Sequence, residues 1–385
     1  MAKYFYRGLK LGVVGGGQLG RMLIQASIDF NVEIHVLDPD PEAPCKPYAH
    51  AFTQGSLDDY ETVYQFGKDL DVITVEIEKV NADALATLKA EGKTVYPDPD
   101  ILRMIQDKRA QKAYYQEHGL PTADFVLVNN ASEVRELGWM PAVNKLGKDG
   151  YDGRGVQILR EPADFDKAFD APGLVEKMVE FEKEIAIIVA RNPQGDIKTY
   201  PLVEMVFHPE HNLVEYLYSP ADVPVVQALR AREIAVDLVK SLDYVGLLAI
   251  EMFALKNGEV LINEIAPRPH NSGHHTIRAC GTSQYEQHLR AILGLPLGDT
   301  TLLTPAAMVN LLGAEGHTGP AVYVGMEDAL AIPGVFPHLY GKAETRPFRK
   351  MGHVTIIDRD VDQLRDKVMR VKDILKVESD RGAGN

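Results

Sequence analysis

Two glutamates, Glu251 and Glu264, lie in a segment that the sequence predicts to be a β-hairpin. Residues 249–255 and 259–265 each have the pattern of a strand, and Asn257-Gly258 between them is typical of a two-residue turn. That turn would pair the two glutamates, whose carboxylates would then lie roughly 5 Å apart and repel each other. Mg²⁺ between them would relieve the repulsion, because hard cations prefer oxygen ligands. Two solvated carboxylates on an edge hairpin are the alternative.

The residues around the end of the hairpin favour the metal site over that alternative. Asn263 offers a neutral oxygen at the same end, and the ten residues 266–275 read APRPHNSGHH. This polar cluster contains Arg268, Asn271 and three histidines, and a solvent-exposed turn does not require so many ligand-binding side chains. We therefore predict a metal site on this hairpin.

A second segment, residues 145–156 with the sequence KLGKDGYDGRGV, has the composition of a phosphate site. Four glycines in the nine residues 147–155 supply backbone N–H donors, and Lys145, Lys148 and Arg154 supply cations. Such a loop suits a lid that opens and closes over phosphates, with a plain flexible hairpin as the alternative.

Three further side chains could complete a nucleotide site. Lys108 lies on a predicted helix over residues 101–118 and could reach a bound polyphosphate. Glu176 lies on a predicted strand over residues 174–178, and Glu184 directly precedes another over residues 185–190; either carboxylate could bind the ribose hydroxyls.

Near the N-terminus, residues 15–20 read GGGQLG after a short apolar strand, and Asp38 ends the next strand. This spacing satisfies the dinucleotide-binding fingerprint and would indicate a nicotinamide-dependent dehydrogenase. The alternative is a doubly wound domain whose glycine turn serves strand–helix packing or binds another phosphate.

The elements that must position these residues fall into three regions, of mixed α/β and α+β class. Residues 1–100 alternate strands and helices as a Rossmann-like domain does. Residues 101–296 form an α+β domain with a lid over about 110–175. Residues 297–378 are short β-rich pieces, with an expected strand at 329–332, and 379–385 look like a disordered tail.

The composition excludes several classes of protein. The chain has 385 residues, 45% of them hydrophobic, and a net charge of −14, which argues against non-specific nucleic-acid binding. Two cysteines offer no disulfide framework. We find no signal-peptide core and no membrane span, so we expect a cytoplasmic protein.

The chain has a phosphate lid, a lysine near the end of a strand (Lys145), a carboxylate for ribose and a metal hairpin. In this combination and order it resembles the ATP-grasp ligases. More narrowly, the chain resembles the 5-(carboxyamino)imidazole ribonucleotide synthetases of purine biosynthesis. The resemblance covers nearly the whole chain and rests on GGGQLGRML at 15–23, DPDP at 38–41, YDGRG at 151–155, LINE at 261–264, APRPHNSGH at 266–274 and KMGH at 350–353.

This resemblance implies an architecture and a reaction. The architecture would be a pre-ATP-grasp domain, a central ATP-grasp domain with a mobile lid and a small C-terminal domain that completes the acceptor site. ATP and Mg²⁺, with two ions expected, would activate bicarbonate as carboxyphosphate. The exocyclic amine of 5-aminoimidazole ribonucleotide would then take the carboxyl group. The likeness also implies a homodimer, with no nucleic-acid or membrane partner.

Individual residues receive roles from the same resemblance. Glu251 and Glu264 would bind Mg²⁺. ATP would be bound by Lys108, Lys145, Gly150, Tyr151, Asp152, Gly153, Arg154, Gly155, Val156, Glu176, Lys177, Met178, Val179, Glu184, Asn263 and Glu264. The acceptor ribonucleotide would be bound by Gly17, Gln18, Leu19, Asn271, Ser272, Lys342 and Arg349. The catalytic residues would be Arg268, which faces bicarbonate, with Asp152, Arg154 and Lys342.

The chain departs from the family pattern at two positions. Lys79 stands where the family usually has asparagine, and Phe207 stands where it usually has a histidine, with His208 following. Three other functions stay open. A dehydrogenase would leave the lid and the glutamate pair without a role, and a nucleotide-sensing module would leave residues 268–275 without one. An ATP-grasp ligase for a different ribonucleotide is the nearest alternative.

Overall fold

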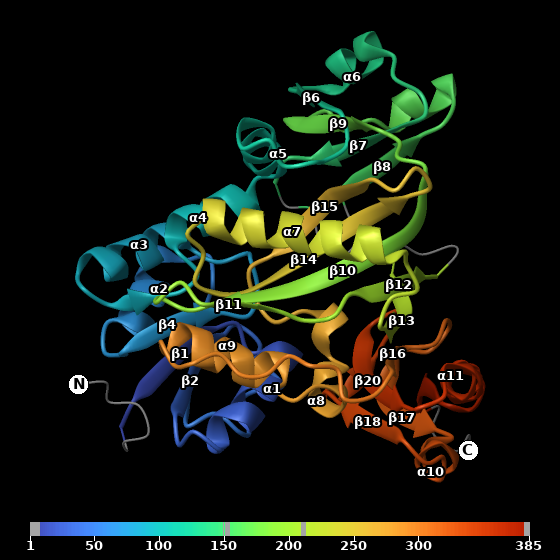
Figure 1. Cartoon of the computed structure of the whole chain (residues 1–385). Helices are drawn as coiled ribbons and strands as arrows, with labels where there is room; N and C mark the ends of the chain where they lie inside the picture. The colour runs from blue at the N-terminus through green and yellow to red at the C-terminus, as the bar shows by residue number, and fades with distance from the viewer. Residues whose placement is uncertain (1–7, 149, 151–154, 209–212, 381–385) are drawn as a thin grey trace.

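The structure is a computed structural model that describes residues 8–148, 150, 155–208 and 213–380 (Figure 1). The N-terminal domain is a parallel five-stranded sheet of order β3-β2-β1-β4-β5, covered by helices on both faces. This burial explains its apolar strands. The half-exposed β3 was not among the predicted strands. The elements are β1 (Lys10–Val14), α1 (Gln18–Ile28), β2 (Glu33–Asp38), β3 (Ala51–Gln54), α2 (Tyr60–Gly67), β4 (Val72–Val75), α3 (Ala82–Ala90) and β5 (Thr94–Val95).

Two helices lead from this domain toward the lid, where the sequence predicted one helix over residues 101–118. They are α4 (Pro99–Gln106) and α5 (Lys108–Glu117). The single-helix prediction is wrong because Asp107 between them is extended, with φ −121°, and its side chain accepts a hydrogen bond from Arg109 N at 2.9 Å. Asp107 therefore caps α5 and places Lys108 at the first position of a new helix.

The lid is a four-stranded antiparallel sheet of order β6-β9-β7-β8. In Figure 1 it forms the upper part of the molecule, above α7. Its small core lies beneath α6, and Trp139 packs against that core. The elements are β6 (Phe125–Val128), α6 (Ala131–Leu137), β7 (Ala142–Leu146), β8 (Val156–Leu159), the 3₁₀ helix η1 (Pro162–Lys167) and β9 (Gly173–Lys177).

One nine-stranded sheet runs through both the central and the C-terminal regions, with order β15-β14-β10-β12-β13-β16-β20-β18 and β11 paired to β10. β13 pairs with β16 from Tyr216↔Val309 to Ser219↔Ala306, so the sheet continues across the boundary expected at residue 296. Its strands are β10 (Phe181–Arg191), β11 (Ile197–Thr199), β12 (Val203–Phe207), β13 (Val214–Ser219), β14 (Gly246–Leu255), β15 (Val260–Ala266), β16 (Ala306–Leu312), β18 (Val335–Leu339) and β20 (Lys350–Ile357).

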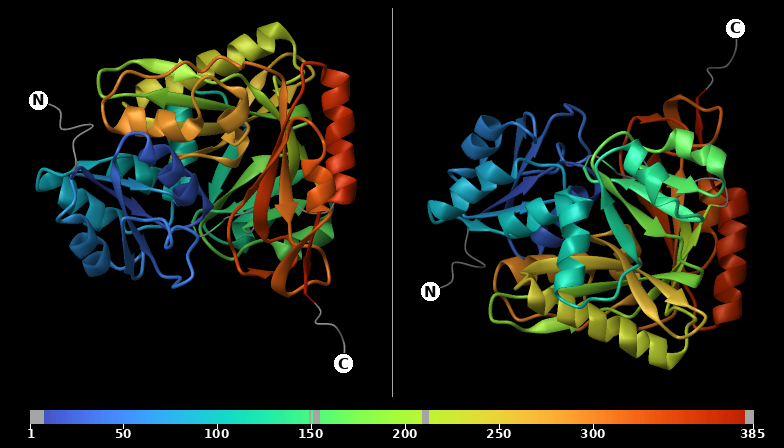
Figure 2. Two further views of the ribbon diagram at one scale, coloured as in Figure 1. Left: turned by 90° about the horizontal axis from the view of Figure 1, so that it is seen from below. Right: turned by 90° about the horizontal axis from the view of Figure 1, so that it is seen from above.

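Helices cover this sheet, and a three-stranded sheet of order β19-β17-β21 completes the C-terminal region. In both views of Figure 2 the C-terminal helix and the N-terminal domain lie on opposite sides of the molecule. The elements are α7 (Val225–Ser241), η2 (Asn271–Gly273), α8 (Thr276–Ala279), α9 (Gln284–Ile292), β17 (Gly319–Val324), α10 (Met326–Leu330), β19 (Glu344–Thr345), α11 (Val361–Ile374) and β21 (Lys376–Ser379).

Two local predictions for the C-terminal region are wrong. The expected strand at 329–332 overlaps the end of α10, whose Ala329 is buried beneath the helix. The disordered tail expected from residue 379 is wrong at its first residue, because Ser379 ends β21 and its N–H donates to His317 Nδ1 at 3.0 Å. Residues 381–385 lie outside the described part of the chain. Within the described ranges no helix has the length and apolar character needed to cross a bilayer.

Candidate active site

Glu251 on β14 pairs with Glu264 on β15, as predicted, but the hairpin reaches this pairing by a different route. The turn has three residues: Gly258 N donates to Leu255 O at 3.0 Å, and Leu255 N donates to Glu259 O at 2.9 Å. Gly258, with φ 93°, takes the left-handed position that such a turn requires. The predicted two-residue turn at Asn257-Gly258 is therefore wrong.

A β-bulge restores the predicted pairing. With a three-residue turn, a regular ladder would place Glu251 opposite Asn263. The register shifts between Met252 and Glu251, so Met252 pairs with Ile262 while Glu251 pairs with Glu264. Asn263 is the extra residue, and the two departures from the predicted hairpin cancel.

The bulge also turns two polar side chains to the same face of the sheet. Ile262 and Ile265 both belong to the core beneath α7, although they are three residues apart. In a regular strand they would point to opposite faces, because side chains alternate. Asn263 and Glu264 between them are only partly buried and stand outside that core. The bulge thus places an amide oxygen and a carboxylate side by side on the face away from α7.

Glu184 on β10 lies on the same face. Its neighbour Ile185 belongs to the core beneath α7, as do Ile250 and Met252 on either side of Glu251. By strand alternation Glu184 and Glu251 therefore both point away from α7. Ala186 of β10 pairs directly with Glu251, which places the two carboxylates on adjacent strands.

Two lysines reach this face from outside the sheet. Lys108 Nζ, at the start of α5, lies 2.7 Å from Glu264 Oε2. Lys145 Nζ, on β7 of the lid, donates to Asn263 Oδ1 at 3.2 Å. The capped start of α5 and the lid sheet therefore both deliver a cation to the bulged part of β15.

Lys145 also belongs to a buried ion network within the lid. Glu176 on β9 lies 2.6 Å from both Lys145 Nζ and Lys112 Nζ, and its side chain is only 5% exposed. Burial alone would raise the pKa of Glu176, but the two lysines hold it at about 2, below its ordinary 4.5. Of the two carboxylates predicted for ribose, Glu176 is thus engaged by lysines, whereas Glu184 faces the site.

The charges of the paired glutamates differ because their neighbours differ. Burial, followed by the charges of Glu264 and Glu184, raises the pKa of Glu251. Lys108 lowers the pKa of Glu264. Glu251 is therefore the member of the pair whose negative charge is destabilised by the neighbouring carboxylates. On this face Glu184, Glu251, Asn263 and Glu264 all offer oxygen atoms as ligands, and oxygen is the ligand that suits Mg²⁺.

The polar segment after β15 packs against this face. His270 Nε2 lies 3.4 Å from Glu251 Oε1, and His270 Nδ1 lies 2.9 Å from Ser272 Oγ. Gln284 accepts from His270 N at 2.9 Å and donates to His270 O at 2.8 Å, which fixes the backbone there. Asn271 and Ser272 form η2, with Ser272 buried.

Arg268 connects this segment to the N-terminal domain. Its Nη2 lies 2.8 Å from Glu78 Oε1, and its side chain is 18% exposed. Glu78 follows β4 by three residues. No local pattern in the sequence predicts this pair, because its partners are 190 positions apart.

The glycine turn of the N-terminal domain is filled by the protein's own carboxylates. Glu76 accepts from Gly17 N at 2.7 Å and from Gly20 N at 2.6 Å, so it caps the start of α1. Asp38, the acidic residue of the fingerprint, accepts from Gly16 N at 2.7 Å. The amides that would bind a pyrophosphate are therefore occupied, and the dinucleotide interpretation of this turn is wrong.

Glu76 was missed in the sequence, although a signal exists. Val14 of β1 pairs with Val75 of β4 in parallel, so the residue after β4 must lie beside Gly15. An acidic residue at that position predicts a protein carboxylate at the glycine turn. Burial raises the pKa of Glu76 to about 7, while its bonds from Gly20 and Gly17 oppose this shift.

Residues predicted for the acceptor come from two regions that touch. Gln18 begins α1, and a Cβ at Gly341 would lie 2.3 Å from Arg21 Nη1 of the same helix. Lys342 Nζ donates to Lys350 O at 2.7 Å and lies 5.7 Å from the centre of the Tyr340 ring. Residues 340–343, the Lys342 loop, thus approach the first turns of α1.

The remaining predicted residues are placed as follows. Arg349 Nη1 donates to Glu344 O at 2.6 Å within the C-terminal region. Lys177 pairs with Asp124 at 2.9 Å on the surface, and the backbone N–H groups of Lys177 and Met178 donate to Asp124 O and Pro141 O. Gly150 and Gly155 lie close together, since a Cβ at Gly155 would lie 3.0 Å from Gly150 Cα, and Val156 begins β8. Tyr151, Asp152, Gly153 and Arg154 lie outside the described residues.

Three family models match consecutive parts of the chain. The ribonucleotide synthetase preATP-grasp domain matches residues 9–106, and the ATP-grasp domain matches residues 113–285. The phosphoribosylaminoimidazole carboxylase C-terminal domain matches residues 306–367.

Whole-chain relatives carry related names. The N5-carboxyaminoimidazole ribonucleotide synthase of Bacillus subtilis is 37% identical over 366 residues, which are 93% of this chain and 94% of that protein. The chloroplastic phosphoribosylaminoimidazole carboxylase of Vigna aconitifolia is 39% identical over 371 residues, which are 93% of this chain. This chain spans only about two thirds of that longer protein, 66% of its length.

Solved structures agree with these relatives. The N5-carboxyaminoimidazole ribonucleotide synthetase of Thermotoga maritima has a TM-score of 0.90 and 44% identity, covering 96% of this chain and 99% of that one. An Aspergillus clavatus enzyme solved with ADP and 5-aminoimidazole ribonucleotide has a TM-score of 0.87 and 32% identity, covering 96% and 98%. Matched in all three domains and over nearly the full length of its bacterial relative, the chain belongs to the N5-carboxyaminoimidazole ribonucleotide synthase family of ATP-grasp ligases.

Proposed function

We propose that this protein carboxylates the exocyclic amine of 5-aminoimidazole ribonucleotide, using ATP and bicarbonate and releasing ADP and phosphate. The observation that carries this proposal is the meeting of Lys108 with Glu264 and of Lys145 with Asn263 on one face of the sheet. Two cations and a row of oxygen ligands on that face suit a metal–nucleotide complex. The relatives' names and the bound ligand of the Aspergillus clavatus enzyme supply the acceptor.

In the first step a bicarbonate oxygen attacks the γ-phosphorus of ATP, the bond to ADP breaks, and carboxyphosphate forms. Lys108 and Lys145 would hold the phosphates, residues 176–179 and Glu184 would hold adenine and ribose, and residues 150–156 would close over them. Glu251 and Glu264, with Asn263 beside them, would bind two Mg²⁺ ions. These ions would neutralise the charge that develops on the phosphate oxygens.

In the second step the amine nitrogen attacks the carboxyl carbon, the bond to phosphate breaks, and the amine loses a proton. Arg268, fixed by Glu78, would face bicarbonate and stabilise the carboxyphosphate charge. The acceptor would lie between α1 and the Lys342 loop, in contact with Gly17, Gln18, Leu19, Asn271, Ser272, Lys342 and Arg349. Asp152 and Arg154 of the lid would meet it there. We also propose a homodimer located in the cytoplasm.

Phosphate release from ATP tests this function. Release should require bicarbonate and should rise strongly when 5-aminoimidazole ribonucleotide is added. Release that is independent of bicarbonate, or that responds equally to a different ribonucleotide amine, would refute the proposal. The second result would indicate another ATP-grasp ligase.

A further inference from the structure

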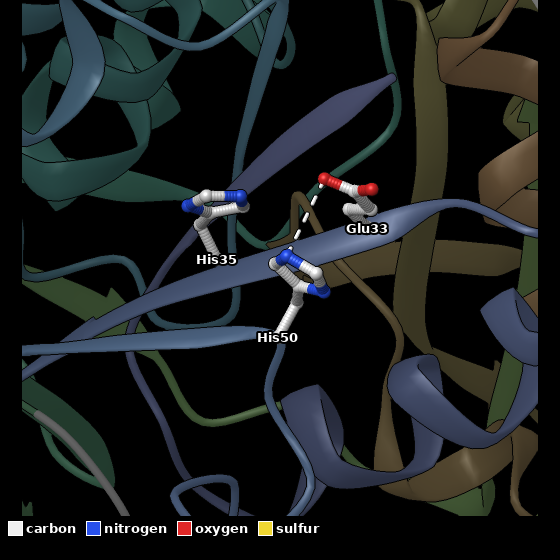
Figure 3. Close-up of side chains that lie close together, drawn as sticks. All are labelled: Glu33, His35 and His50. Atoms are coloured by element: carbon white, nitrogen blue, oxygen red, sulfur yellow. Dashed lines mark ion pairs between the residues drawn. The ribbon is translucent and has the colours of Figure 1, made fainter. Parts of the chain in front are cut away.

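Three metal-ligating side chains gather on the N-terminal sheet, outside the active site described above. Glu33 and His35 lie on β2, and His50 directly precedes β3 (Figure 3). One ligand atom from each lies within 4.8 Å of the other two, and His50 Nε2 is 3.5 Å from Glu33 Oε2. It is the one group of three or more such ligands found among the described residues.

The fold itself produces this arrangement. Glu33 and His35 are two residues apart on one strand, so they point to the same face. His50 N donates to Ile34 O at 2.8 Å, which fixes the third residue beside the first two. In Figure 3 the three side chains turn toward a common space. The cluster therefore depends on the regular parallel pairing of β2 with β3, and not on a mobile loop.

The spacing suits a tetrahedral metal. Zn–N and Zn–O bonds of about 2.0–2.1 Å place neighbouring ligand atoms roughly 3.4 Å apart. The separation of 3.5 Å between His50 and Glu33 already fits this value. The other separations, all within 4.8 Å, would close by at most about 1.4 Å. His50, whose side chain is 56% exposed, has the freedom to make that movement.

The ligand types select the class of metal. Two imidazoles and one carboxylate suit Zn²⁺ and related transition metals, whereas Mg²⁺ and Ca²⁺ prefer oxygen ligands alone. His35 Nε2 is buried and has no hydrogen-bond partner among the described residues, so a metal bond there would satisfy an otherwise costly polar atom. Burial and the nearby His50 and Lys10 lower the pKa of His35, which favours its neutral imidazole.

We propose that Glu33, His35 and His50 form a binding site for a Zn²⁺-class divalent cation. The metal would join the edge strand β3 to β2. It would lie at the opposite end of β2 from Asp38, which supports the glycine turn. Five residues of parallel strand separate the two ends, or roughly 16 Å. The metal should therefore stabilise the sheet edge without altering turnover.

Calorimetric titration of the untagged full-length protein with Zn²⁺ tests the proposal. ADP and excess Mg²⁺ are present throughout, so that the oxygen-rich active site is already occupied. We expect one Zn²⁺ per chain. His50→Gln should lower the affinity at least tenfold, because loss of even an outer partner of a metal ligand costs about 10–100-fold. The matched control is His118→Gln, another exposed histidine, which should bind Zn²⁺ as the wild type does.

The outcomes are distinct. Absence of saturable Zn²⁺ binding in the wild type, or equal binding by the His50→Gln and His118→Gln variants, would overturn the proposal. A second readout is the thermal unfolding temperature, which Zn²⁺ should raise in the wild type and not in Glu33→Gln. An equal rise in Glu33→Gln would also overturn it. Turnover of Zn²⁺-free His50→Gln, assayed with Mg²⁺, should match that of the wild type, which shows that the variant is folded.

Discussion

Replacing Glu176 with glutamine should destabilise the lid by about 3–5 kcal/mol, the usual result of removing one partner of a buried ion pair. Glu176 is nearly fully buried and lies 2.6 Å from each of Lys112 and Lys145. Its pKa of about 2, against an ordinary 4.5, corresponds to about 3 kcal/mol. The two magnitudes agree. Glutamine keeps the shape of the side chain but leaves both ammonium groups without a counter-charge.

The same pKa fixes the pH dependence. A carboxylate whose pKa is lowered by folding stabilises the folded state fully above its unfolded pKa of about 4.5. That contribution is lost as the pH falls toward the folded value of about 2. The difference in the free energy of unfolding between wild type and Glu176→Gln should therefore be largest near neutral pH and should shrink below about pH 4.

Urea unfolding followed by tryptophan fluorescence measures this difference. Trp139 is the chain's single tryptophan and packs against the lid core, so its emission reports on the domain that contains Glu176. The matched control is Asp124→Asn, which breaks the exposed pair with the adjacent residue Lys177. That change should cost less than about 1 kcal/mol. If Glu176→Gln is no more destabilising than Asp124→Asn, or if the gap persists in acid, the reasoning about the buried network is wrong.

Four further changes test the proposed active site. Glu251→Gln should abolish turnover. The Mg²⁺-free variant should nevertheless keep or gain stability, because Glu251 is the repelled member of the pair. Thermal unfolding without Mg²⁺ checks this, and a clear loss of stability would contradict it. Glu264→Gln should also stop turnover but should lower that stability, since it removes a carboxylate held by a lysine at 2.7 Å. Lys342→Ala should raise the Michaelis constant for the ribonucleotide at least about tenfold, because one charge-assisted contact is lost. The Michaelis constant for ATP should barely change. A parallel rise in both constants would show that Lys342 does not bind the ribonucleotide specifically. In Gly17→Ala the new Cβ would lie 2.4 Å from Glu76 Oε1, so the turn must shift, and steady-state kinetics should again show weaker ribonucleotide binding with unchanged ATP binding.

Much of the fold class and the family could be predicted from the sequence, because they depend on local patterns and strings. The hairpin pairing of Glu251 with Glu264 was also predicted correctly, but partly by cancellation. Asn-Gly favours a two-residue turn, whereas the chain uses Lys256 as a third turn residue and compensates with the bulge at Asn263. Bulges follow from packing of the strand against its neighbours, and the sequence of one strand does not show them.

The long-range partners could not be predicted in the same way. The contacts of Glu76 with the glycine turn and of Glu78 with Arg268 join residues far apart in the chain. The dinucleotide fingerprint was satisfied in spacing, yet its amides were already bonded within the domain. A motif of residue types records which groups are available locally, and it carries no information on which groups the tertiary fold has used.

The pairing of β13 with β16 determines which parts of this protein can be exchanged or removed. Because the ladder joins the central region to the C-terminal one, the hairpin of Glu251 and the strand β18, which leads into the loop of Lys342, are parts of one continuous sheet. A shortened chain that ends before β16 would leave β13 as an open edge, which is a template for aggregation. The C-terminal region is therefore not a detachable module, and a chimera with a foreign acceptor domain would have to supply a strand that matches β13 residue for residue.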